Sequence, residues 1–186
     1  VSASMSTDDG SAKGTTARVD SAYGVGATYV TTAGDTTVTI GGGFGGSEVV
    51  KTGTQMTADK EGFNIGVSAV TGDLTVGVAF GDGDSIKDEG GSVNTQIDGS
   101  VTVAGIKYVT GDLTFNVGIA SGEADDHSNG GSDGDDDSQD VTSASVSYAV
   151  ASGVTAILGY TSTESSDEGS GTDDGSAWYI GANMSF

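Results

Sequence analysis

Apolar residues alternate with small or polar residues in ten separate runs, and this two-residue period is what most limits the fold of the chain. In the run "LTFNVGIA" the apolar positions are Leu113, Phe115, Val117 and Ile119. Successive side chains of a β-strand point to opposite faces, so each run predicts a strand with one apolar face. The predicted strands are Val1–Ser6, Ala17–Val30, Thr36–Phe44, Phe63–Val70, Leu74–Phe80, Ser100–Thr110, Leu113–Ala120, Val141–Val150, Val154–Thr161 and Ala177–Phe186.

The connections between these runs alternate strictly between short and long. The short ones, at Ala33–Asp35, Thr71–Asp73, Thr110–Asp112 and Ala151–Gly153, have the Gly-Asp or Ser-Gly composition of tight hairpin turns. The others are long and hydrophilic. The pattern predicts a single all-β domain over residues 1–186, an antiparallel up-and-down sheet with every tight turn at one end. Outer-membrane barrels have this arrangement.

Composition excludes several classes of protein. The chain has 33 glycines and no proline, which favours strands over helices. A formal net charge of -21 excludes a nucleic-acid partner, because phosphate binding needs many lysines and arginines. There are no cysteines, and no apolar run is long enough for a transmembrane helix. The only histidine, His127, lies in a predicted loop without a nucleophile beside it, so we expect no enzyme.

The character of the two strand faces predicts which face meets lipid. The face opposite the apolar residues is mostly Gly, Ser, Thr and Asn, whereas a solvated outer face would carry many charges. We therefore expect a transmembrane β-barrel whose apolar face points outward. The predicted pore-lining residues are Arg18, Asp20, Thr28, Asn64, Ser68, Thr75, Lys107, Asn116 and Asn183.

Aromatic residues near the strand ends are expected to form belts at the two membrane interfaces. They are Tyr23, Tyr29, Phe63, Phe80, Tyr108, Tyr148, Tyr160, Trp178 and Phe186. One run resists the simple alternation, because in "SVTVAGIKYVT" the pair Val101 and Val103 has the opposite parity to Ile106 and Tyr108. A β-bulge would bring all four to one face. Without a bulge, the assignment of the apolar residues to one face fails for half of this run.

The stretches "VSASMSTDDG", "SAYGVGATYV", "VTGDLTVGVAFGDGD", "VTGDLTFNVGIASGE" and "YIGANMSF" resemble the general diffusion porins of alphaproteobacteria, of the purple-bacterial type. The resemblance implies a 16-stranded homotrimeric barrel of which this chain is the carboxy-terminal ten strands, without the constriction loop. It also implies a water-filled channel in the bacterial outer membrane for passive diffusion of ions and small hydrophilic solutes. In such porins, basic wall residues help select solutes, which would be the role of Arg18 and Lys107; the alternative is that both lie at the rim. A complete ten-stranded barrel also remains open.

The composition of the acidic segment from Glu123 to Asp140 predicts a solvated surface loop. The alternative is weak calcium binding, with Asp133, Asp135 and Asp137 as ligands, and a bridge to lipopolysaccharide phosphates in the outer membrane. The segment is not an EF-hand, because Ser138 stands where the loop needs glycine. No other cofactor is expected. The competing function is an acidic, calcium-dependent β-rich surface protein or adhesin, which would need its apolar strand faces packed inward.

Overall fold

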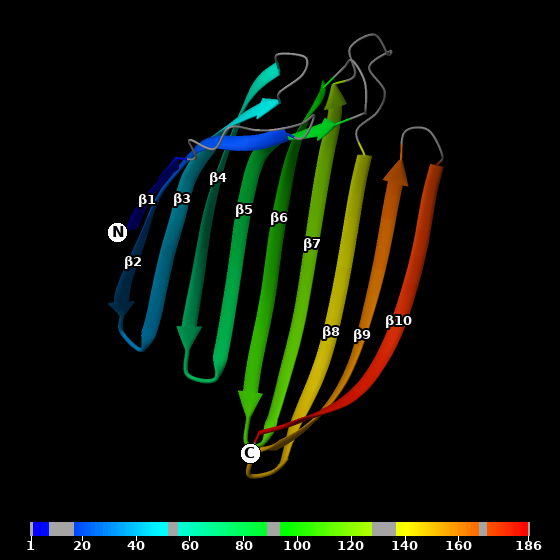
Figure 1. The fold of residues 1–186 in the computed structure, drawn as a ribbon. Coiled ribbons are helices and arrows are strands. Elements are labelled where there is room, and N and C mark those ends of the chain that lie inside the picture. Colours follow the sequence, from blue (N-terminus) through cyan, green and yellow to red (C-terminus); the bar gives the residue numbers. More distant parts are fainter. Residues whose placement is uncertain are drawn as a thin grey trace.

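The protein forms one antiparallel β-sheet of ten strands, seen in a computed structural model that describes residues 2–7, 17–51, 56–88, 94–127, 137–167 and 171–185 (Figure 1). The predicted number, order and direction of the strands are confirmed. The strands are β1 (Ser2–Thr7), β2 (Ala17–Ala33), β3 (Thr36–Lys51), β4 (Met56–Thr71), β5 (Leu74–Asp88), β6 (Asn94–Thr110), β7 (Leu113–His127), β8 (Asp137–Ala151), β9 (Val154–Asp167) and β10 (Gly171–Met184).

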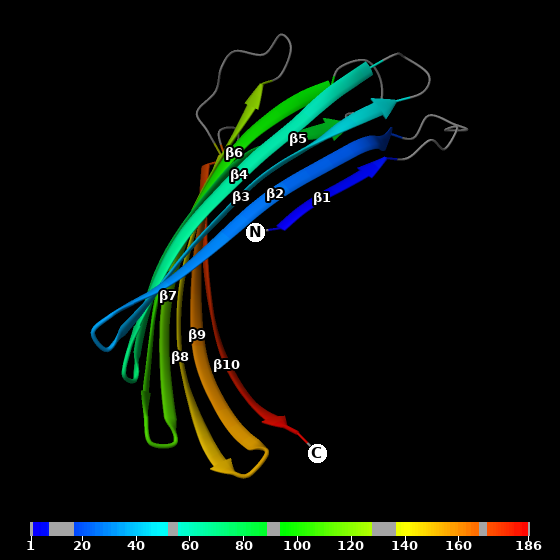
Figure 2. The same cartoon turned by 90° about the vertical axis from the view of Figure 1, so that its left-hand side faces the viewer.

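Every strand pairs with its neighbour in sequence, so the sheet has the order β1 to β10 without a crossover. Among the described residues, β1 pairs only with β2, and β10 pairs only with β9. The sheet is therefore open, with β1 and β10 as its two edges. It is strongly bent, so that one of its faces is concave (Figure 2).

Four tight turns join the strands at one end of the sheet, as predicted. At three of them a glycine with positive φ is followed by aspartate: Gly34 (φ 61°), Gly72 (φ 55°) and Gly111 (φ 57°). Positive φ at the first turn residue alone is typical of a type II′ turn, which suits the twist of a hairpin. The fourth turn has its positive φ at Gly153 (75°) instead.

The strands extend beyond the predicted runs at the end opposite the tight turns. β5 continues to Asp88 and β7 to His127, and β4 begins at Met56. These extensions are polar and acidic, so they lack the apolar alternation on which the predicted bounds depended. Backbone pairing between neighbouring strands continues beyond the residues where the apolar alternation ends.

The strand register confirms that the apolar residues share one face. On neighbouring strands Val25 pairs with Phe44, Phe44 with Phe63, and Ile106 with Val117. Of the two alternatives for β6, the structure supports the one without a bulge, because β6 pairs with β5 and β7 without a register shift. Val101 and Val103 therefore lie on the small-residue face, opposite Gly81 and Ala79.

No apolar side chain in the described part of the chain is buried. Ile180 is 87% exposed and Trp178 is 73% exposed, and large apolar residues on the other strands are also exposed. Two faces of one sheet cannot pack against each other, and none of the described strands forms a second layer over the apolar face. Soluble proteins rarely expose so large an apolar surface. No helix in the described ranges is long and apolar enough to cross a membrane.

Candidate channel wall

The face of the sheet opposite the large apolar residues, here called the small-residue face, forms the concave side. Bending a sheet brings the side chains of its concave face together, so that face must carry little bulk. On β3 and β5 this face has glycine at many positions, and a Cβ atom on Gly45 would lie 2.9 Å from the carbonyl oxygen of Tyr23. The bulky apolar residues therefore belong to the convex face, and the small residues form a curved wall.

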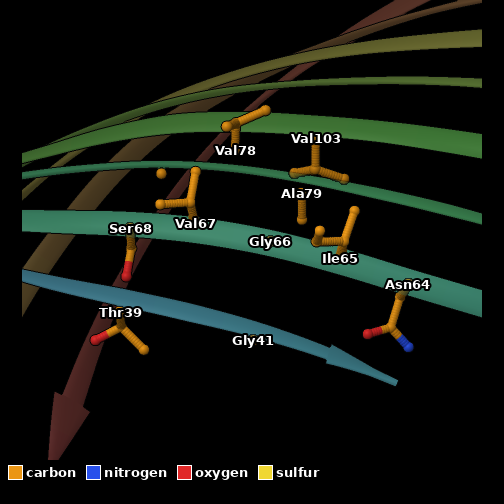
Figure 3. A pocket seen from close by; sticks show the side chains of 11 residues that line it. Thr39, Gly41, Asn64, Ile65, Gly66, Val67, Ser68, Val78, Ala79 and Val103 are labelled. Carbon is orange, nitrogen blue, oxygen red and sulfur yellow. The ribbon is translucent and has the colours of Figure 1, made fainter. Parts of the chain in front are cut away.

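Seven of the predicted pore-lining residues lie on this wall. Register relates Thr75 to Lys107 and Lys107 to Asn116, so these three side chains leave the sheet on the same side. Asn64 and Ser68 point to the opposite side of β4 from Ile65 and Val67 (Figure 3). The wall thus receives Thr28, Asn64, Ser68, Thr75, Lys107, Asn116 and Asn183.

A hollow of about 540 Å³ lies over β3 to β6, at the residues drawn in Figure 3. Thr39, Ser68 and Asn64 contribute its polar groups, and Gly66 and Gly77 leave the backbone bare. Because glycine adds no side chain, the wall is deeper here than a wall of larger residues would be.

The prediction for Arg18 and Asp20 rested on strict alternation along β2, and β2 does not keep it. The register with β3 shifts between Val19 and Ser21, so that Asp20 is skipped in the pairing. Beyond the shift, Arg18 pairs with Val50. The alternation in the middle of β2 therefore does not predict which face Arg18 is on. The side chains of Arg18 and Asp20 lie outside the described residues.

Among the lysines whose side chains are described, Lys60 and Lys107 contribute positive charge to the small-residue face. The sequence pattern predicts Lys107 on this face but not Lys60, because "ADKEG" lacks the apolar alternation and falls in a predicted loop. The structure places Lys60 in β4, paired with Ser47 and sharing its face with Asn64. Within the described ranges, no carboxylate forms an ion pair with either ammonium group. The sequence alone does not show that Lys60 lies in a strand, because only its pairing with β3 indicates this.

Carboxylates gather instead on the convex face, beyond the apolar band at the long-connection end. They have the parity of the apolar residues on the same strands, and they are Glu48, Glu61, Asp82, Asp84, Asp98, Glu123, Asp140, Glu164 and Asp174. We call this set the outer carboxylate belt. Asp137, Asp167 and Asp173 lie on the other face of the sheet. Most of the acidic strand residues with described side chains therefore point away from the wall.

Two members of the belt face each other directly. Asp84 pairs with Asp98 across β5 and β6, beyond the apolar part of both strands. Partial burial raises the pKa of Asp84, and its hydrogen bond to Asp98 and the repulsion between the two carboxylates raise it further. Like charges that lie directly opposite each other on neighbouring strands repel, and this repulsion is one of the causes of the raised pKa.

The predicted aromatic residues other than Phe186 lie on the apolar face, and Phe186 is outside the described residues. Three cross-strand aromatic contacts occur on this face, with ring centroids 5.7 Å apart for Tyr23 and Phe44, 5.8 Å for Phe63 and Phe80, and 4.8 Å for Tyr160 and Trp178. The Tyr23 ring also crosses Gly46, and its hydroxyl donates a 3.1 Å hydrogen bond to Glu61. An aromatic ring with a polar tip beneath a carboxylate is typical of a membrane interface.

The predicted calcium ligands are mostly outside the described residues. Asp133 and Asp135 fall there, and Asp137 is exposed at the first position of β8. In the part of the chain that the structure describes, no group of three His, Cys, Asp or Glu side chains is placed to hold a metal ion. Calcium binding remains a prediction.

The sequence profile of Gram-negative porins matches residues 1–168. The chain belongs to the Gram-negative porin family. This porin chain is placed in the bacterial outer membrane by its family. A search of curated proteins found none with significant sequence similarity to it.

Solved structures share the porin fold. A porin refined at 1.8 Å resolution matches with a TM-score of 0.59 and 20% identity, over 89% of this chain and 51% of that one. Outer-membrane expressed OmpT of Vibrio cholerae matches with a TM-score of 0.57 and 20% identity, over 91% and 56%. A loop L8 deletion mutant of OmpT matches with a TM-score of 0.54 and 16% identity, over 89% of this chain and 63% of that one. The porin chain therefore spans about half to two thirds of the length of these proteins.

Proposed function

We propose that this porin forms part of the wall of a water-filled channel through which ions and small hydrophilic solutes diffuse passively. The observation that supports this function is the contrast between the two faces of one bent sheet. The apolar face has nothing in the described chain to cover it, and the concave face carries mostly Gly, Ser, Thr and Asn, with Lys60 and Lys107 among its described side chains. Lipid is the solvent that suits the first face, and water suits the second.

The adhesin alternative has no support. A soluble β-rich surface protein would pack its apolar strand faces into a core, yet large apolar side chains of nearly every described strand are exposed. The family match and the fold also point to a channel without enzymatic activity.

Three finer proposals follow from the likeness to longer porins. We infer that further strands complete the barrel, because both edges of the described sheet lack a second partner and the relatives are longer. We propose that the chain is the carboxy-terminal ten strands of a 16-stranded barrel of the alphaproteobacterial type. A homotrimer is proposed on the same resemblance.

Conductance across a planar lipid bilayer tests the channel proposal directly. The full-length protein, extracted in detergent, is expected to give stepwise openings, in groups of three if the trimer is correct. Openings that come singly would contradict the trimer alone. Well-folded protein that never conducts would contradict the channel.

We also propose that the porin contacts lipopolysaccharide through divalent cations held between lipid phosphates and the outer carboxylate belt. Weak calcium binding by Asp133, Asp135 and Asp137, which are not members of this belt, is a separate proposal. The support is the position of the belt on the lipid-side face, beyond the aromatic residues. Two anionic surfaces repel each other unless cations neutralise them, and calcium and magnesium prefer oxygen ligands.

Replacing Glu123, Asp140 and Glu164 together by Gln, Asn and Gln is expected to reduce calcium-dependent retention of lipopolysaccharide on the purified porin about two- to tenfold, since each exposed charge contributes little alone. Retention is measured by assaying bound lipopolysaccharide before and after addition of a chelator. Asp173→Asn, on the small-residue face, is the control and should leave retention unchanged. Equal retention by the triple variant and the wild type would exclude the belt as the contact.

A further inference from the structure

Tyr179 stands apart from the other aromatic residues of the porin. It pairs with Gly159, a residue of the small-residue face, whereas Trp178 and Tyr160 beside it pair on the apolar face. All other described aromatic side chains lie on the apolar face by register. Tyr179 is therefore the one aromatic ring that the described sheet presents to the channel.

Gly159 determines how this ring lies. The ring carbon Cζ and the hydroxyl of Tyr179 contact Gly159 where a side chain would otherwise begin, and Gly159 is buried as a result. The ring thus leans across β9 along the wall. Tyr179 remains 48% exposed, so the ring still presents surface to the lumen. None of the described residues forms a hydrogen bond with its hydroxyl.

Polar side chains continue the same row across the sheet. Gly159 pairs with Ser145, Ser145 with Asn116, and Asn116 with Lys107. The side-chain nitrogen of Asn116 donates a 3.3 Å hydrogen bond to Ser145 Oγ, which fixes both groups on the wall. Adjacent strands are about 4.8 Å apart, so one or two strand spacings separate the ring from these groups. An aromatic surface therefore lies within about 10 Å of fixed hydrogen-bonding groups.

We propose that Tyr179, with Ser145 and Asn116, forms a contact site on the channel wall for small cyclic sugars. A pyranose has an apolar face of C–H groups that packs on an aromatic ring, and hydroxyls at its edge that exchange hydrogen bonds with amide and hydroxyl groups. Acyclic polyols of the same size have no such flat face. The site lengthens the residence of sugars and leaves small ions unaffected. This inference rests on the proposed channel function.

The test records single channels of the full-length porin while glucose or the acyclic polyol sorbitol is added, and derives residence times from the current noise. Glucose is expected to reside longer than sorbitol in the wild type. Tyr179→Phe keeps the ring and should preserve the difference, whereas Tyr179→Leu should shorten glucose residence about two- to tenfold. Tyr148→Leu is the matched control, since its ring lies on the apolar face.

The outcomes separate this site from the channel function. Channels that open normally but treat glucose and sorbitol alike in the wild type would overturn the site and leave the channel intact. The same holds if glucose residence is unchanged in Tyr179→Leu. If Tyr179→Leu does not fold, Asn116→Ala decides instead, and it should shorten glucose residence as well. Absence of any openings from folded protein would overturn the channel itself.

Discussion

Replacing Gly153 by valine is expected to destabilise the hairpin of β8 and β9 and to lower the ratio of folded to unfolded porin by tenfold or more. Gly153 has a φ of 75°, which a β-branched residue adopts only at a cost of about 1–3 kcal/mol. A Cβ atom there would also lie 2.6 Å from the carbonyl oxygen of Ser185, a backbone atom that cannot rotate away. The Gly153 carbonyl meanwhile accepts a 2.8 Å hydrogen bond from the Ser185 amide.

The measurement is the folded fraction after refolding into detergent at increasing urea, read from the mobility of unboiled protein on a gel. Gly181→Val is the matched control. Gly181 lies inside β10 with no atom within 4 Å of a built Cβ, and valine suits a strand. Equal folded fractions for Gly153→Val and Gly181→Val would show that the turn tolerates both the strain and the collision.

The turns and the apolar alternation were predictable because each has a local physical cause. Gly-Asp between two alternating runs needs only the positive φ of glycine to close a hairpin, and Gly34, Gly72 and Gly111 have it. The pairing of Val25 with Phe44 follows once the turn fixes the register.

The acidic strand ends were not predictable in this way. A strand whose residues are polar on both faces has no apolar period, so "ADKEG" was interpreted as loop and Lys60 was missed. The structure assigns it to β4 because β3 continues beside it. The strand forms here because its backbone pairs with β3, and not because of a local apolar pattern.

The remaining differences arise where one strand departs from strict alternation. In β6 the change of parity at Ala104 and Gly105 leaves a bulge or a change of face as alternatives, and the structure shows the change of face, with Val101 and Val103 opposite Gly81 and Ala79. In β2 the sequence shows no sign of the shift after Val19, because the neighbouring residues are polar and small. Register irregularities depend on the partner strand, which one run of sequence does not contain.

Reversing the charge of Lys107 is expected to shift the selectivity of the channel toward cations. Lys107 lies on the wall between Thr75 and Asn116, and within the described part of the chain no carboxylate pairs with its ammonium group. Most described carboxylates of the strands point to the other side of the sheet. The net charge of the chain is therefore a poor guide to the charge of the channel wall.

The size of the effect follows from Coulomb's law. Lys107→Glu changes the wall by two unit charges, which at about 10 Å in water alters the energy of a monovalent ion by about 0.8 kcal/mol. That energy corresponds to about a fourfold change in local ion concentration, and salt screening reduces it. The anion and the cation respond in opposite directions, so the ratio of anion to cation permeability should fall roughly three- to eightfold in dilute salt, and less in concentrated salt.

Reversal potentials measured across a tenfold gradient of potassium chloride give this ratio. Glu123→Lys is the control, because it makes an equal charge change of opposite sign on β7 but on the convex face. Its effect on the ratio should be smaller than that of Lys107→Glu, since the sheet separates it from the lumen. Lys60→Glu should act in the same direction as Lys107→Glu, because both lysines share the small-residue face. A reversal potential that responds to Glu123→Lys and not to Lys107→Glu would mean that ions pass along the opposite face of the sheet from the one assigned here.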